Sequence, residues 1–65
     1  MTTEKNNKKI LIVEDDEDFL FILEKAFASS GFEVSTAKDG ESAIAAALKA
    51  RPDIILSDVL MPRTD

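Results

Sequence analysis

Acidic side chains follow two short apolar runs, one near each end of the chain. Five consecutive acids, residues 14–18, come directly after Ile10–Val13, and Asp58 comes shortly after Ile54–Leu56. Carboxylate oxygens are hard ligands, which suit Mg²⁺. An Asp beside Mg²⁺ can also act as a nucleophile toward phosphorus and form an aspartyl phosphate. The chemistry therefore depends on whether the fold brings some of the first acids beside Asp58.

Composition limits the classes of function. The chain has 65 residues, a net charge of −5, 45% hydrophobic residues and 32% charged residues, which is typical of one small globular domain at most. The negative charge argues against a nucleic-acid or anionic-membrane surface. The chain lacks Cys and His, which excludes disulfides, zinc-finger sites and His-based catalysis. No apolar run could span a bilayer, and residues 1–7 lack the apolar core of a secretory signal, so we expect a cytoplasmic location.

The apolar runs predict the strands that position these acids. Ile10–Val13 and Ile54–Leu56 are continuous apolar runs, which are typical of parallel strands buried on both faces. Residues 32–37 alternate apolar and polar side chains, which predicts a half-exposed edge strand. Residues 16–30 and 41–50 have helical periodicity. The chain therefore alternates strands and helices in the order β-α-β-α-β.

Each helical segment has one apolar face, which we expect to lie against the sheet. In the first helix the inward residues are Phe19, Ile22, Leu23, Ala26 and Phe27. Leu20 falls at the rim of this face and Phe21 in the middle of the polar face. In the second helix the inward residues are Ala43, Ile44, Ala47 and Leu48. Gly31 should end the first helix in a left-handed conformation, and Asp39 should cap the second.

Alternating strands and helices indicate right-handed crossovers and a parallel sheet. The two fully apolar strands should be neighbours, which gives the strand order 2-1-3, the first half of a flavodoxin-like sheet. Their ends would lie about 4.8 Å apart, with Glu14 and Asp15 beside Asp58. Three clustered carboxylates repel one another, and at least one pKa rises unless a cation such as Mg²⁺ is present. The alternative is an acidic sheet edge without function, with Asp16, Glu17 and Asp18 serving to cap a helix.

Three segments, Lys9–Asp16, Asp39–Glu41 and Pro52–Pro62, carry a more specific signal. Together they resemble the receiver domain of two-component response regulators. The resemblance implies a phosphoacceptor module, not an enzyme, in which Asp58 takes a phosphoryl group from a sensor histidine kinase or a phosphotransfer protein. It also implies Mg²⁺ as the cofactor.

The resemblance assigns roles to individual residues. It implies that Asp15 ligates Mg²⁺ directly, that Glu14 assists through water, and that Asp58 and the backbone carbonyl of Leu60 complete the protein's share of the site. Because the family's first helix docks the kinase, it also implies that Leu20 and Phe21 form a partner contact.

The sequence departs from the family's pattern toward its C-terminal end. Thr64 stands where the family more usually has Met. Residues 8–65 correspond to the N-terminal half of a receiver domain, truncated before strand 4, and residues 1–7 to a disordered tail. The family's switch Ser/Thr and its phosphate-pairing Lys have no counterpart in these residues. Without a fourth strand, the third should be an exposed edge.

An exposed third strand leads to a second hypothesis, a self-associating assembly module that keeps the fold without phosphorylation. Exposed apolar edges pair with other chains, so a homo-oligomer through this strand is expected; a partly molten monomer is the competing expectation. A third class, a Mg²⁺-dependent phosphohydrolase with an Asp nucleophile, would require a second Asp two residues after Asp58. Leu60 occupies that position.

Overall fold

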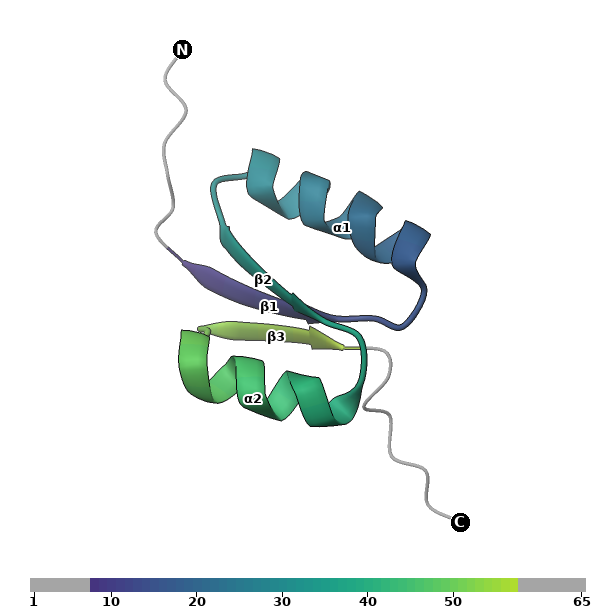
Figure 1. Cartoon of the computed structure of the whole chain (residues 1–65). Helices are drawn as coiled ribbons and strands as arrows, with labels where there is room; N and C mark the ends of the chain where they lie inside the picture. Colours follow the sequence, from purple (N-terminus) through teal and green to yellow (C-terminus); the bar gives the residue numbers. More distant parts are fainter. Residues whose placement is uncertain (1–7, 58–65) are drawn as a thin grey trace.

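The computed structural model describes residues 8–57, which form three strands and two helices (Figure 1). In chain order these are β1 (Lys9–Val13), α1 (Glu17–Ser29), β2 (Glu33–Ala37), α2 (Gly40–Ala50) and β3 (Ile54–Ser57). The β-α-β-α-β order predicted from the sequence is confirmed. The expected tail, residues 1–7, and the turn at Asp58–Pro62 lie outside the described residues, so both stay predictions.

The three strands form one parallel sheet in the order β2-β1-β3, as predicted. β1 pairs with β2 from Lys9↔Glu33 to Val13↔Ala37, and with β3 from Ile10↔Ile54 to Val13↔Ser57. Figure 1 shows α1 on one face of this sheet and α2 on the other. The architecture is therefore a three-layer α/β arrangement around β1.

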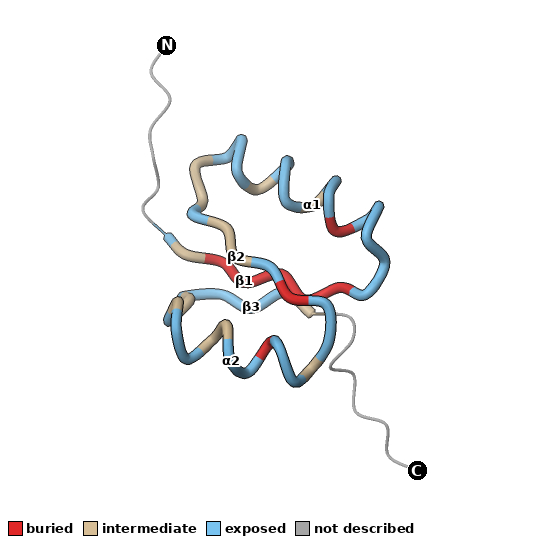
Figure 2. Tube along the Cα trace, viewed as in Figure 1, coloured by how far each residue is buried: buried red, intermediate tan, exposed pale blue. Residues whose placement is uncertain are grey.

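β1 is the centre of the hydrophobic core (Figure 2). Its side chains Ile10, Leu11, Ile12 and Val13 are at most 2% exposed. Because side chains alternate along a strand, Ile10 and Ile12 pack on the α1 side, and Leu11 and Val13 pack on the α2 side. The continuous apolar run thus reports a strand that is covered on both faces.

The predicted inward face of α1 is only partly correct. Leu23 and Phe27 pack against the sheet as expected, together with Leu20, which is 8% exposed. The prediction that Leu20 lies on the outward side or rim is therefore wrong. Phe19 and Ile22, expected to be inward, are 46% and 59% exposed. Ala26 is exposed as well.

The position of α1 over the sheet explains this difference. The helix contacts β1 and β2 but not β3. Its apolar stripe is wider than the surface it covers, so the side that faces β2 and β1 is buried and the side toward β3 is not. Phe19 lies on that second side, where it lines a pocket with Leu56 of β3.

The face of α2 shows the same pattern. Ala43 is buried and Ala47 packs beside it, as predicted. The prediction for Ile44 and Leu48 is wrong, because these side chains are 65% and 75% exposed. α2 contacts β1 and β2 through its small alanine side chains, and it does not contact β3. The larger apolar side chains are therefore left outside the interface.

β3 is the strand that differs most from its predicted environment. Ile54, Ile55 and Leu56 were expected to be buried on both faces, but 40%, 51% and 39% of their surfaces are exposed. The reason is that neither helix lies over β3. Within residues 8–57 its one strand neighbour is β1.

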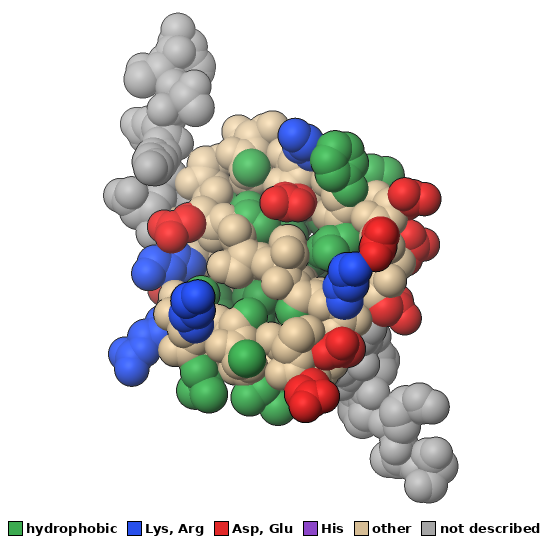
Figure 3. Space-filling view, viewed as in Figure 1, with side chains coloured by type: hydrophobic (Ala, Val, Ile, Leu, Met, Phe, Trp, Pro, Cys, Tyr) green, Lys and Arg blue, Asp and Glu red, His purple; other side chains and the backbone are tan. Residues whose placement is uncertain are grey.

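Charge is divided along the strand direction (Figure 3). At the amino edge, where the strands begin, lie Lys8, Lys9, Lys49 and Arg51, with Glu33 and Asp53 among them. At the carboxyl edge lie residues 14–18, Asp39 and Glu41, with Lys38. Among the described residues no helix is long and apolar enough to cross a membrane.

The end of α1 depends on a glycine. Gly31 has φ 93°, in the left-handed region, where residues with a Cβ are strained. This conformation lets the N–H of Gly31 donate to Ala28 O and the N–H of Phe32 donate to Phe27 O, a Schellman motif. The Phe27 and Phe32 rings meet edge to face with centroids 5.4 Å apart. The turn therefore connects α1 to β2 and contributes to the core.

We predict that Gly31→Ala destabilises the chain by about 1–2 kcal/mol, because alanine is strained in the left-handed region. Gly40→Ala is the matched control, since Gly40 begins α2 without positive φ. There alanine should be neutral or stabilising. Urea unfolding followed by circular dichroism measures both. Equal stability of the two variants would contradict the role given to Gly31.

Candidate functional site at the carboxyl edge

The parallel pairing aligns the ends of all three strands. Val13 of β1 is the partner of Ala37 in β2 and of Ser57 in β3. The residue after each strand therefore reaches the same edge of the sheet. Glu14 follows β1 and Lys38 follows β2, whereas Asp58, which follows β3 in the sequence, lies outside the described residues.

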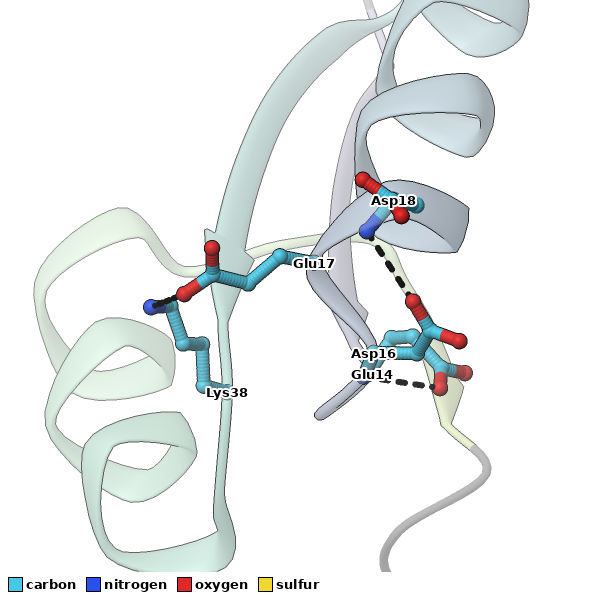
Figure 4. Close-up of polar contacts among 5 residues, drawn as sticks. All are labelled: Glu14, Asp16, Glu17, Asp18 and Lys38. Atoms are coloured by element: carbon cyan, nitrogen blue, oxygen red, sulfur yellow. Dashed lines mark hydrogen bonds and ion pairs between the residues drawn. The ribbon is translucent and has the colours of Figure 1, made fainter.

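Glu14 is held by the backbone around it. Its N–H donates to Ala37 O at 3.0 Å, which extends the pairing of β1 with β2 by one residue. Its Oε2 accepts the N–H of Asp16 at 3.2 Å (Figure 4). The residue is 6% exposed, so this acidic side chain is almost buried. The orientation of Glu14 is thus set before any ligand is considered.

Asp15 has the opposite environment. It is exposed, and within residues 8–57 its side chain makes no hydrogen bond or ion pair. Glu14 and Asp15, the first two of the predicted metal-binding acids, both follow β1 at this edge. Residues 8–57 contain no group of three or more side chains that could hold a metal, and the other predicted ligands, Asp58 and Leu60, lie outside this range.

The remaining acids of the run belong to the start of α1. Asp16 is the N-cap, and its Oδ1 accepts the N–H groups of Asp18 and Phe19 at 3.0 and 3.2 Å (Figure 4). Glu17 and Asp18 occupy the first turn, where negative charge favours the helix dipole. The capping interpretation is confirmed for these three residues, which separates them from Glu14 and Asp15.

Lys38 is a charged residue of this edge that the sequence analysis did not single out. Its Nζ donates to Glu17 Oε2, which joins the loop after β2 to the first turn of α1 (Figure 4). This hydrogen bond, together with the positive charge of Lys38, holds the pKa of Glu17 below its ordinary value. The signal in the sequence was its position directly after the second strand, because parallel neighbours end at the same edge.

Asp39 caps α2, as predicted. Its Oδ1 accepts the backbone N–H of Ser42 at 2.7 Å and the hydroxyl of the same residue at 2.8 Å. Both hydrogen bonds favour the ionised carboxylate and hold the pKa of Asp39 below its ordinary value. The backbone N–H of Ser42 makes the larger contribution and its hydroxyl the smaller one. Each helix therefore begins at the carboxyl edge with an aspartate whose carboxylate accepts N–H groups of that helix.

An apolar pocket of about 280 Å³ lies beside Glu14. Its walls come from β1, α1 and β3, and the lining residues are Ile12, Val13, Glu14, Phe19, Leu23, Leu56 and Ser57. Glu14 is the one charged residue in this lining. On the side of the sheet that α1 covers, the acidic edge therefore borders an apolar pocket.

The outward side of α1 carries Phe21, which the sequence analysis assigned to a partner contact with Leu20. Phe21 is 59% exposed, and the Lys25 Nζ lies 5.1 Å from its ring centroid. Leu20 is buried under α1 and is not part of this surface. An exposed aromatic ring beside a lysine remains available there.

Comparison with known proteins identifies the family. The family model of the response regulator receiver domain matches residues 10–65. The chain belongs to this family. The match runs from the second residue of β1 through β3 and includes Glu14, Asp15 and Asp58, so the resemblance noted in the sequence is confirmed.

Curated relatives of this receiver domain are regulators. The chain is 46% identical over 65 residues to the transcriptional regulatory protein PrrA of Mycobacterium leprae, covering all of this chain and 28% of that protein. It is 44% identical over 59 residues to the alkaline phosphatase synthesis transcriptional regulatory protein PhoP of Bacillus subtilis, covering 91% of the chain and 25% of PhoP. It is 47% identical over 57 residues to the response regulator PleD of Caulobacter vibrioides, and the match covers 88% of this chain and 13% of PleD.

The receiver domain chain thus spans 28% or less of the length of these relatives. No solved structure matches it.

The ion pair between Lys38 and Glu17 gives a prediction for pH dependence. Lys38→Met should raise the pKa of Glu17 toward its ordinary value, since both the hydrogen bond and the positive charge are lost. A lowered pKa in the folded state stabilises the fold above the unfolded pKa, and this contribution is lost as pH falls through the folded pKa. The stability difference between parent and variant should therefore disappear in acid.

Carboxyl NMR titration of Glu17 measures this change. Lys25→Met is the control, because Lys25 lies over Phe21 rather than beside Glu17. The shift should shrink at high salt, since the pair is exposed. An identical Glu17 pKa in the parent and Lys38→Met would show that the pair does not form in solution.

Proposed function

We propose that this receiver domain accepts a phosphoryl group on Asp58, with Mg²⁺ bound beside it, from a histidine kinase or phosphotransfer protein in the cytoplasm. The observation that carries the proposal is the pairing of Val13 with Ser57. Glu14 and Asp15 follow Val13, and Asp58 follows Ser57 in the sequence. Open parallel sheets bind ligands at this carboxyl edge.

The donor set fits Mg²⁺, which prefers carboxylate, carbonyl and water oxygens. Asp15 is the proposed direct ligand, because its exposed carboxylate has no other bond within residues 8–57. Glu14 already accepts an N–H with one oxygen, which leaves the other to hold a metal-bound water. Asp58 and the backbone carbonyl of Leu60 are the proposed remaining ligands. When bound, Mg²⁺ offsets the negative charge of the carboxylates and of the incoming phosphate.

The proposed reaction is a phosphoryl transfer between side chains. A carboxylate oxygen of Asp58 attacks the phosphorus of a phosphohistidine and forms a P–O bond. The P–N bond breaks, and its electron pair returns to the imidazole nitrogen of the donor. The proposed role of Glu14 and Asp15 is to hold the cation that offsets the negative charge of the phosphoryl group, while Lys38 is engaged by Glu17.

The proposed partner surface for the donor is the outward side of α1. Phe21 lies there, exposed and close to the Lys25 ammonium. Aromatic residues, Phe among them, are enriched in protein interfaces relative to the rest of the surface. Of the two residues predicted for this contact, only Phe21 is accessible, because Leu20 belongs to the core.

We predict that incubation of the 65-residue chain with Mg²⁺ and acetyl phosphate adds about 80 Da, the mass of one phosphoryl group. Intact-mass spectrometry detects the adduct, and fragmentation should locate it on Asp58. Asp58→Asn is the matched control and should remain unmodified. An adduct that persists in Asp58→Asn would contradict the assignment.

Glu14→Gln tests the metal site separately. Because Glu14 is proposed to act through water, its loss should weaken Mg²⁺ binding by about 10- to 100-fold. Asp18→Asn is the control at the start of α1, where the acid serves the helix rather than the site. Isothermal titration calorimetry with Mg²⁺ measures both variants. Equal affinities would mean that Glu14 does not support the metal.

Phe21→Ser should slow phosphotransfer from a histidine kinase without unfolding the chain, because the side chain is 59% exposed. Ala28→Ser is the matched control on the same helix, since Ala28 is also exposed. Labelling by acetyl phosphate should stay unchanged in both variants, because that small donor does not need the α1 surface. Equal rates of phosphotransfer from the kinase to both variants would show that Phe21 is not part of the partner contact.

A further inference from the structure

Two connections join the acidic turn, residues 14–17, to the end of β2. The first is a backbone hydrogen bond, in which the N–H of Glu14 donates to Ala37 O at 3.0 Å. The second is the ion pair in which Lys38 Nζ donates to Glu17 Oε2 (Figure 4). Ala37 and Lys38 are adjacent in the sequence. The acidic turn is therefore attached at both of its ends to the same point of the neighbouring segment.

Asp15 lies between these two connections. Its side chain is exposed and makes no hydrogen bond or ion pair within residues 8–57. Asp16, the next residue, is fixed by its N–H bond to Glu14 Oε2 and by its carboxylate, which caps α1. The Asp15 carboxylate is directed only by the backbone that carries it. Its position therefore depends on how firmly the two ends of the acidic turn are held.

We propose that Lys38 is a positioning residue for the metal site, because its pairing with Glu17 restrains the acidic turn that presents Asp15 to Mg²⁺. This inference rests on the proposed function and adds to it a residue that neither ligates the metal nor touches a reacting atom. Groups that orient the ligands of a metal raise its affinity, because less freedom is lost on binding. The Lys38–Glu17 pair supplies this restraint at the end of the turn that has no backbone bond to β2.

The charge of Lys38 distinguishes positioning from a simple electrostatic effect. Lys38 lies at the same edge as the acidic turn, because Ala37 is the partner of Val13. A positive charge at this edge repels a cation, so by Coulomb's law alone its removal should strengthen Mg²⁺ binding. Positioning predicts the opposite, since loss of the pair with Glu17 releases one end of the turn. The sign of the change in Mg²⁺ affinity therefore separates the two effects.

Isothermal titration calorimetry with Mg²⁺ on the 65-residue chain measures this sign. We expect Lys38→Met to weaken Mg²⁺ binding about two- to five-fold, the range for loss of an exposed ion pair. Lys38→Arg still donates to Glu17 and should keep the parent affinity. Lys49→Met removes the same charge from the last turn of α2, at the opposite edge of the sheet, and should not weaken binding.

Two outcomes of the calorimetry would count against the proposal in different ways. Mg²⁺ binding by Lys38→Met that is equal to or tighter than that of the parent would overturn the positioning role and leave the proposed function standing. A parent chain that does not bind Mg²⁺ would overturn the positioning role together with the proposed function.

NMR relaxation of the backbone amides in the metal-free chain tests the restraint itself. The order parameters of Asp15 and Asp16 should be about 0.85 in the parent, as in rigid backbone, and fall toward about 0.6 in Lys38→Met. Lys38→Arg should restore the parent values. Urea unfolding should show Lys38→Met still folded, because the pair is exposed. Equal order parameters in the parent and in Lys38→Met would show that Lys38 does not restrain the acidic turn.

Discussion

The structure depends on β1 being paired on both sides and covered on both faces. Burial of the four side chains from Ile10 to Val13 contributes roughly 1.5–3 kcal/mol each, which makes this strand the largest local source of stability. The same pairing aligns the ends of the neighbouring strands at one edge. Stability and site geometry therefore come from one set of interactions, and a shift of β1 by one residue would disrupt both.

The run of five acids, residues 14–18, divides into two groups with different environments. Asp16 accepts N–H groups at the start of α1, Glu17 pairs with Lys38, and Asp18 lies in the first turn of the helix. Glu14 is buried and oriented by a backbone N–H, whereas Asp15 is exposed. The division follows the geometry of the strand-to-helix turn, because the helix needs its capping groups only from Asp16 onward. The first two acids, Glu14 and Asp15, lie outside this cap.

The two helices cover the sheet unevenly, and this is where prediction from the sequence failed. Helical periodicity identifies an apolar stripe, but it does not say which part of a wide stripe faces the sheet. Leu20 is buried and Ile22 exposed because α1 lies over β1 and β2. In α2, Ile44 and Leu48 remain outside although their spacing is that of an inward face. Neither helix covers β3 within residues 8–57, so its apolar side chains remain partly exposed there.

The sequence by itself determined the order of the elements, the parallel sheet, both capping aspartates and Gly31, since these depend on local periodicity and turn chemistry. It also placed Glu14 and Asp15 at the carboxyl edge. Only the tertiary structure decided the burial of Leu20, the exposure of β3 and the pairing of Lys38 with Glu17. These features depend on where the helices lie over the sheet and on contacts between residues distant in the chain. Local patterns do not contain that information.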